Sequence, residues 1–204
     1  MLLRGGLQFR GLVVRVGSMA LAYSTQNKLG SAAPAFRLPG VDGNFHQLSD
    51  YKNAKAIVVV FMCNHCPYVI AVQARINALA KEYSARNIQF LAVNSNDSIR
   101  YPDDGFEAMK VRAIEENFAF PYLWDETQEV ARAYGAVCTP EFYLYKVNPN
   151  GATCLDYQGR LDDSWKDEAK VTHSDLRLAI EDVLAGKKPS SDQKPAMGCS
   201  IKWK

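Results

Sequence analysis

The sequence predicts an α/β domain in which helices cover a central mixed β-sheet, and three observations favour this fold class. Residues 56–62 form a continuous apolar run rich in β-branched side chains, which is typical of a strand buried on both faces. A stretch with helical spacing of its apolar residues follows at 68–84, and a second apolar run follows at 88–94. Strand, helix and strand with short connections form a βαβ unit, whose strands are normally parallel.

Composition narrows the class of protein. The chain has 204 residues, 48% of them hydrophobic and 23% charged, which is the composition of a soluble globular domain rather than a disordered or fibrous chain. No apolar run approaches the roughly 18 residues that a membrane-spanning helix needs. The formal net charge is only +2. We therefore expect neither nucleic acid nor a membrane as a partner.

Residues 1–26 are expected to be an N-terminal extension, either disordered or used for targeting. No acidic residue precedes Asp42, and Arg10 and Arg15 interrupt every apolar segment that a secretory signal would need. We therefore expect a cytoplasmic protein. The alternative is an organellar protein, if residues 1–18 act as a transit peptide, because such peptides are rich in arginine and poor in acids.

We expect the domain itself to span residues 27–186. Proline and glycine are frequent in its first part, which predicts a loop with a small hairpin pairing 36–38 with 45–47, then one helical turn at 47–51. The polar segment 95–104 predicts a loop. The other expected elements are a helix over 106–117, a short strand within 118–124, antiparallel strands over 141–146 and 154–158 with a turn at 148–151, and an aperiodic C-terminal tail over 187–204.

Helix caps define two further expected helices. Asp125 and Gln128 have the spacing of a capping box, which predicts a helix through Tyr134. Thr172 is expected to cap a last helix that ends at Ala185.

The chain has five cysteines, and only two of them are close in sequence. They are Cys63, Cys66, Cys138, Cys154 and Cys199. An odd number at irregular spacing is not the disulfide framework of a secreted protein. A structural zinc site normally needs a second pair of ligands, and covalent haem attachment needs a histidine where Pro67 stands. We therefore expect no metal and no organic cofactor.

The Cys63–Cys66 pair lies where the buried strand is expected to end and the helix to begin. A helix N-terminus carries partial positive charge and free N–H donors, so it is expected to lower the pKa of the Cys63 thiol. Cys66 lies one turn further and can attack a mixed disulfide to release a substrate. The alternative is a pair of unreactive core cysteines.

Several segments together resemble the thioredoxin superfamily. The chain is most similar to bacterial thioredoxin-like and peroxiredoxin-like proteins related to AhpC/TSA, a family often described as thiol-disulfide isomerases. The matching segments are Phe61–Tyr68, Phe120–Leu123, Asp125–Val130, Thr139–Glu141 and Gly198–Trp203. The resemblance implies a thioredoxin-like fold and a thiol-disulfide oxidoreductase that needs no cofactor. It also implies a protein or small-molecule disulfide as substrate and a dithiol as electron donor.

The resemblance also assigns roles to single residues. Cys63 is expected to be the attacking thiol and Cys66 the resolving one. Pro140 corresponds to the cis-proline of thioredoxins, whose loop lies against the active-site disulfide. His65 occupies the place where strongly oxidising relatives have histidine, which implies a more oxidising pair than that of thioredoxin. Glu141 is a candidate base.

Two departures from thioredoxin lie near the cysteine pair, and Glu141 is a candidate substitute for the missing base. Met62 replaces the tryptophan that precedes the motif in thioredoxin. Ile57 stands where thioredoxin buries an aspartate that assists proton transfer. The alternative for Glu141 is an ordinary surface carboxylate.

The sequence leaves open two alternative functions and the roles of three cysteines. A peroxiredoxin-like thiol peroxidase is one alternative, although neither register of its motif matches. A binding protein for copper or another thiophilic metal is the other. Cys138 is expected to be a packed thiol or a third redox partner, and Cys154 to be a core residue. Cys199 is expected to be either a second resolving cysteine or a free thiol near a docked Trp203.

Overall fold

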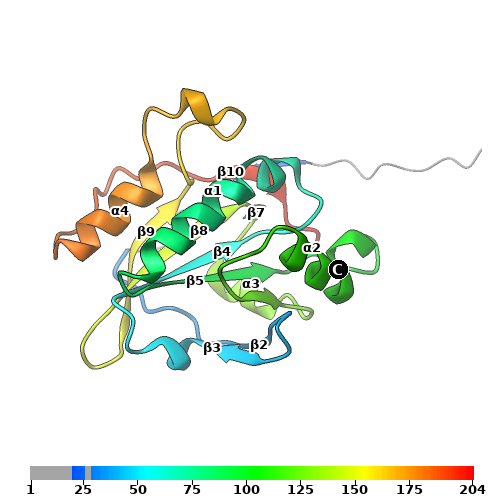
Figure 1. The fold of residues 1–204 in the computed structure, drawn as a ribbon, viewed down its shortest axis with the longest axis horizontal. Helices are drawn as coiled ribbons and strands as arrows, with labels where there is room; N and C mark the ends of the chain where they lie inside the picture. Colours follow the sequence, from blue (N-terminus) through cyan, green and yellow to red (C-terminus); the bar gives the residue numbers. More distant parts are fainter. Residues whose placement is uncertain (1–19, 26–28) are drawn as a thin grey trace, which may run out of the picture.

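A five-stranded mixed sheet forms the centre of the molecule (Figure 1). The computed structural model describes residues 20–25 and 29–204. In spatial order the strands are β6 (Tyr122–Trp124), β5 (Ile88–Asn94), β4 (Ala56–Phe61), β8 (Glu141–Val147) and β9 (Thr153–Gly159). Strands β4, β5 and β6 are parallel, whereas β8 runs antiparallel to both β4 and β9. The predicted fold class, βαβ unit and antiparallel pair are thus confirmed.

Strand β4 shows why the sheet needs cover on both faces. All six of its residues are buried, and successive side chains enter two different clusters. Ala56, Val58 and Val60 pack in a cluster with residues of α1 (Pro67–Ser84), α2 (Phe106–Glu115) and α4 (Asp175–Leu184). The alternate side chains pack with α3 (Glu129–Tyr134) on the other face. A strand with apolar residues at every position is stable only between two such layers.

The first helix begins where the sequence predicts. Cys66 is the N-cap of α1, and Pro67 occupies the first helical position, where its missing N–H costs no hydrogen bond. Val69, Val72 and Ile76 are buried along one side of the helix. This packing fixes the helix against the sheet, and with it the short segment between β4 and α1.

A hairpin precedes the central strand as expected. Strands β2 (Arg37–Pro39) and β3 (Phe45–Gln47) pair antiparallel, and a 3₁₀ turn, η1 (Leu48–Tyr51), follows. Two more such turns are η2 (Pro102–Asp104) and η3 (Glu168–Lys170).

The predicted starts of two helices are wrong. Helix α3 begins at Glu129, because Gln128 adopts a left-handed conformation with φ of 66° and buries its amide. The Asp125 carboxylate still accepts the backbone N–H of Ala131, but no capping box forms with Gln128. Helix α4 has Ser174 as its N-cap, because the Thr172 hydroxyl donates to Asp163 instead.

Both terminal segments contain strands that the sequence did not reveal. Strand β10 (Met197–Ser200) lies between β1 (Leu21–Tyr23) and β7 (Cys138–Thr139) in a small antiparallel sheet. The tail expected over 187–204 is therefore partly a strand, and so is the extension expected over 1–26. Residues 1–18, the transit peptide of the organellar alternative, lie outside the described residues. Across 20–25 and 29–204, no helix is long and apolar enough to cross a membrane.

Candidate active site

The segment between β4 and α1 carries two buried thiols that both contact one residue. Cys63 is 1% exposed and Cys66 is 0% exposed. The Cys63 sulfur lies 3.4 Å from the Thr139 hydroxyl, and the Cys66 sulfur lies 3.3 Å from the Thr139 carbonyl oxygen. The Thr139–Pro140 bond is cis, as the resemblance implies for Pro140.

A third thiol completes the cluster. Cys199 lies on β10 directly opposite Thr139 of β7 and is 2% exposed. The Cys66 thiol is hydrogen-bonded to both Cys63 and Cys199. The tail therefore folds back on the active-site pair, and Cys66 is the central sulfur of three.

The pKa of the Cys63 thiol is raised, not lowered as its place before a helix predicts. Burial raises the pKa of Cys63, and the hydrogen bond with Cys66 and the nearby Asp104 carboxylate raise it further. Hydrogen bonds from Cys199 and Cys63 instead lower the pKa of Cys66. The reason is the complete loss of solvent at Cys63, which outweighs the effect of the helix N-terminus. Of the two thiols, Cys66 therefore has the lower pKa while β10 is docked.

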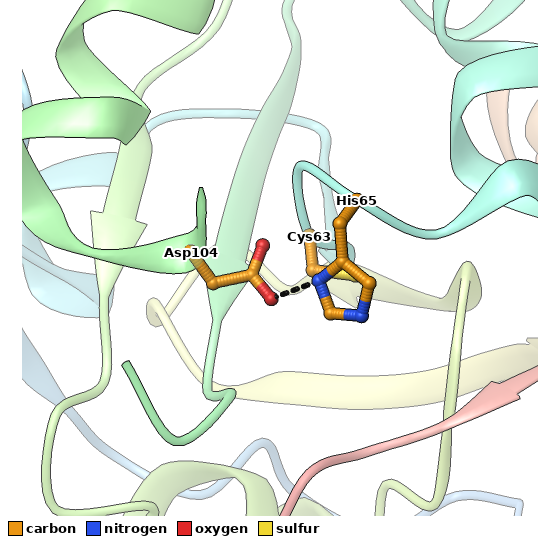
Figure 2. Close-up of side chains that lie close together, drawn as sticks. All are labelled: Cys63, His65 and Asp104. Atoms are coloured by element: carbon orange, nitrogen blue, oxygen red, sulfur yellow. Dashed lines mark hydrogen bonds and ion pairs between the residues drawn. The ribbon is translucent and has the colours of Figure 1, made fainter. Parts of the chain in front are cut away.

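His65 is held beside Cys63 by a buried carboxylate that sequence analysis missed. Figure 2 shows Asp104 and the His65 ring facing each other, and the Asp104 Oδ2 to His65 Nδ1 distance is 2.5 Å. The hydrogen bond to Asp104 raises the pKa of His65, against the opposing effect of burial. The ring also stacks on Tyr101, with centroids 5.2 Å apart. The His65 ring is therefore held in one position by Asp104 and Tyr101.

Asp104 is itself fixed by donors from two loops. Its carboxylate accepts the Asn64 backbone N–H at 2.7 Å and the Asn96 side-chain amide at 2.7 Å, and it is fully buried. A buried carboxylate needs such donors to replace the hydrogen bonds that it loses from water. The only sequence signal for this role is its place in the polar loop after β5, near the carboxyl end of a parallel strand.

Glu141 is buried, and its hydrogen-bond partners do not include Cys63 or Cys66. Its carboxylate accepts the Tyr143 hydroxyl at 2.7 Å, the Gln158 amide at 2.8 Å and the Val137 N–H at 3.1 Å. Burial raises its pKa. The expected surface alternative is wrong, because Glu141 is 0% exposed. Its role as a base stays a prediction.

The two remaining cysteines differ from each other. Cys138 is a packed thiol, as one of the two expectations had it: it is 0% exposed, and its sulfur lies 3.8 Å from both Glu141 Oε2 and the Ala196 carbonyl oxygen. Cys154 was expected in the core, but it is only half-buried, because β9 is an edge strand. Its sulfur lies 3.8 Å from the Asp156 carboxylate.

We expect Asp104→Asn to lower the pKa of His65, because the hydrogen bond to Asp104 is the largest cause of its increase. A raised pKa in the folded state means that the pair stabilises the fold fully below about pH 6.5 and loses this contribution as pH rises through the raised value. NMR titration of the His65 ring measures the change. Asp103→Asn, an exposed neighbour, is the matched control. An unchanged His65 titration in Asp104→Asn would contradict the assignment.

Comparisons with known proteins identify the family and the fold. The family model described as AhpC/TSA family matches residues 29–161. The chain is 29% identical over 122 residues to the thiol-disulfide oxidoreductase ResA of Geobacillus thermodenitrificans, covering 59% of this chain and 64% of that protein. The match thus spans less than two thirds of the relative's length.

Solved structures show the same fold. An uncharacterized conserved protein from Geobacillus kaustophilus is 45% identical, with a TM-score of 0.85 over 92% of this chain and 98% of that one. A thioredoxin from Streptococcus pneumoniae superposes with a TM-score of 0.51 and 21% identity, over 65% of this chain and 93% of that one. The fold is therefore thioredoxin-like, and the chain belongs to the AhpC/TSA family.

Proposed function

We propose that this protein is a thiol-disulfide oxidoreductase that uses Cys63 and Cys66 to reduce or exchange disulfides. One observation carries the proposal: two hydrogen-bonded thiols at the start of a helix both contact the residue before a cis-proline. The family relation and the likeness to a protein described as a thiol-disulfide oxidoreductase support it.

In the proposed reaction Cys63 attacks one sulfur of a substrate disulfide. A bond forms between Cys63 and that sulfur, the substrate bond breaks, and the other substrate sulfur leaves as a thiolate. Cys66 then attacks the Cys63 sulfur, which releases the second substrate thiol and closes the Cys63–Cys66 disulfide. Cys66 is placed for this second step because its sulfur lies in hydrogen-bond contact with Cys63. An external dithiol returns the pair to its reduced form.

Cys63 must become exposed before it can react with a substrate, because it is 1% exposed here. Burial is the largest cause of its raised pKa, so exposure to solvent also favours its thiolate. A hollow of about 330 Å³ beside Pro140, lined also by Val72, Trp165 and Met197, offers space for a substrate side chain.

The test is a redox titration against glutathione with mass spectrometry of the alkylated peptides. We expect one two-electron transition of the Cys63–Cys66 pair between about −270 and −120 mV. His65 is expected to place the value above the thioredoxin end of this range, because an imidazolium stabilises the thiolates of the reduced form. Failure of a Cys63–Cys66 disulfide to form would contradict the proposal.

A thiophilic metal site is the second candidate, and one observation favours it. Ligand atoms of Cys63, His65 and Asp104 all lie within 4.8 Å of one another. A thiolate, an imidazole and a carboxylate suit zinc better than copper(I), which prefers softer ligands. Titration of the reduced protein with Zn²⁺ separates the candidates: a tight one-to-one complex that blocks Cys63–Cys66 oxidation would favour the metal site.

A further inference from the structure

Cys199 is held beside the active-site pair by contacts along the whole C-terminal segment. On β10, the Ser200 N–H donates to Ala20 at 2.9 Å. After β10, the Ile201 N–H donates to Val137 at 2.9 Å and the Lys202 N–H donates to the Asn96 side chain at 2.8 Å. The buried Gln128 amide donates to the Lys202 carbonyl at 2.8 Å. These contacts hold Cys199 in a defined position beside Cys63 and Cys66.

A glycine allows the strand to come this close. A Cβ atom built on Gly198 would lie 2.0 Å from the carbonyl oxygen of Thr139. Real Cβ atoms do not approach an oxygen so closely, so any other residue would push β10 away from β7. The same Thr139 contacts both Cys63 and Cys66. Gly198 thus allows β10 to place the Cys199 thiol beside the other two thiols of the site.

We propose that Cys199 is a second resolving cysteine, which takes over the disulfide by attacking Cys66. This proposal rests on the proposed function of the Cys63–Cys66 pair. It follows from the position of Cys66, which is hydrogen-bonded to both other thiols, so that either can become its disulfide partner.

The step balances without an external oxidant. The Cys199 thiolate attacks the Cys66 sulfur of the Cys63–Cys66 disulfide. The Cys66–Cys199 bond forms, the Cys63–Cys66 bond breaks, and the electron pair leaves with the Cys63 sulfur. The proton that Cys199 loses is regained at Cys63. The molecule keeps one disulfide throughout, and Cys63 is again a thiol.

This exchange changes what the electron donor must reduce. The disulfide is now between the N-cap of α1 and the C-terminal strand, and Cys63 takes no part in it. In the Cys66–Cys199 form, β10 is covalently attached to the site that it covers. The donor dithiol must therefore attack a disulfide of the tail rather than the Cys63–Cys66 pair.

The direct test uses Cys63→Ser oxidised with glutathione disulfide. Glutathione first forms a mixed disulfide with Cys66, and Cys199 then displaces it as reduced glutathione. After alkylation with N-ethylmaleimide and digestion, we expect Cys66–Cys199 peptides at least about tenfold above any Cys66–Cys138 or Cys66–Cys154 pairing. The double variant Cys63→Ser/Cys154→Ser, whose second change lies outside the site, should give the same Cys66–Cys199 product as Cys63→Ser alone.

A second variant tests the position of strand β10 rather than the Cys199 thiol itself. Gly198→Ala retains all five cysteines but displaces β10 from Thr139, so we expect the Cys66–Cys199 product to fall at least about tenfold while Cys63–Cys66 still forms. Formation of Cys63–Cys66 in the unaltered protein without any Cys66–Cys199 in Cys63→Ser would overturn this inference and leave the proposed function intact. Absence of both disulfides would overturn both.

Discussion

Replacing Cys63 with serine is expected to reduce the turnover of a disulfide substrate to the uncatalysed rate, a loss of more than about 1,000-fold. A serine hydroxyl cannot form the mixed disulfide through which the substrate is reduced. The reduction of insulin with dithiothreitol as electron donor measures the effect.

Cys66→Ser separates the two roles. This variant keeps the attacking thiol but lacks the resolving one, so we expect it to accumulate a stable mixed disulfide between Cys63 and the substrate. Intact-protein mass spectrometry detects the added mass. Cys154→Ser on the edge strand β9 is the control and should retain full turnover. Substrate trapped on Cys66 in Cys63→Ser, with none on Cys63 in Cys66→Ser, would show that the roles are reversed.

The predicted elements closest to the site follow from local patterns. The run 56–62 has an apolar residue at every position, which only a strand covered on both faces tolerates. Pro67 and the spacing of Val69, Val72 and Ile76 are sufficient to start α1 at the observed residue. These local signals alone bring Cys63 and Cys66 to a strand–helix junction.

The rest of the site depends on contacts distant in sequence. Asp104 contacts His65 across 39 positions, and nothing in the polar loop around it indicates that partner. Strand β10 has four residues without alternation of apolar and polar side chains. It is a strand because β1 and β7 pair with it and because Gly198 permits close approach to Thr139. Local sequence patterns carry no information on either contact.

The second large effect concerns stability and is expected for Glu141→Ala. The truncation leaves the Val137 and Cys138 N–H groups and the Tyr143 hydroxyl without their acceptor. A buried donor left unsatisfied costs about 1–3 kcal/mol, so the expected loss in the free energy of unfolding is at least about 3 kcal/mol. Urea denaturation measures it. Glu126→Ala, at an exposed position, is the control and should change stability by less than about 0.5 kcal/mol.

Glu141→Gln distinguishes a structural carboxylate from a catalytic base. The amide keeps one acceptor oxygen but places its NH₂ group against donors, so we expect a smaller loss of stability than in the alanine variant. If Glu141 only holds the segment before Pro140, the pH profile of Cys63–Cys66 disulfide formation in Glu141→Gln matches that of the unaltered protein. If Glu141 accepts a proton during resolution, that rate falls most at the pH values where the native carboxylate is ionised. Because burial raises the Glu141 pKa, the difference would grow as the pH rises through that pKa.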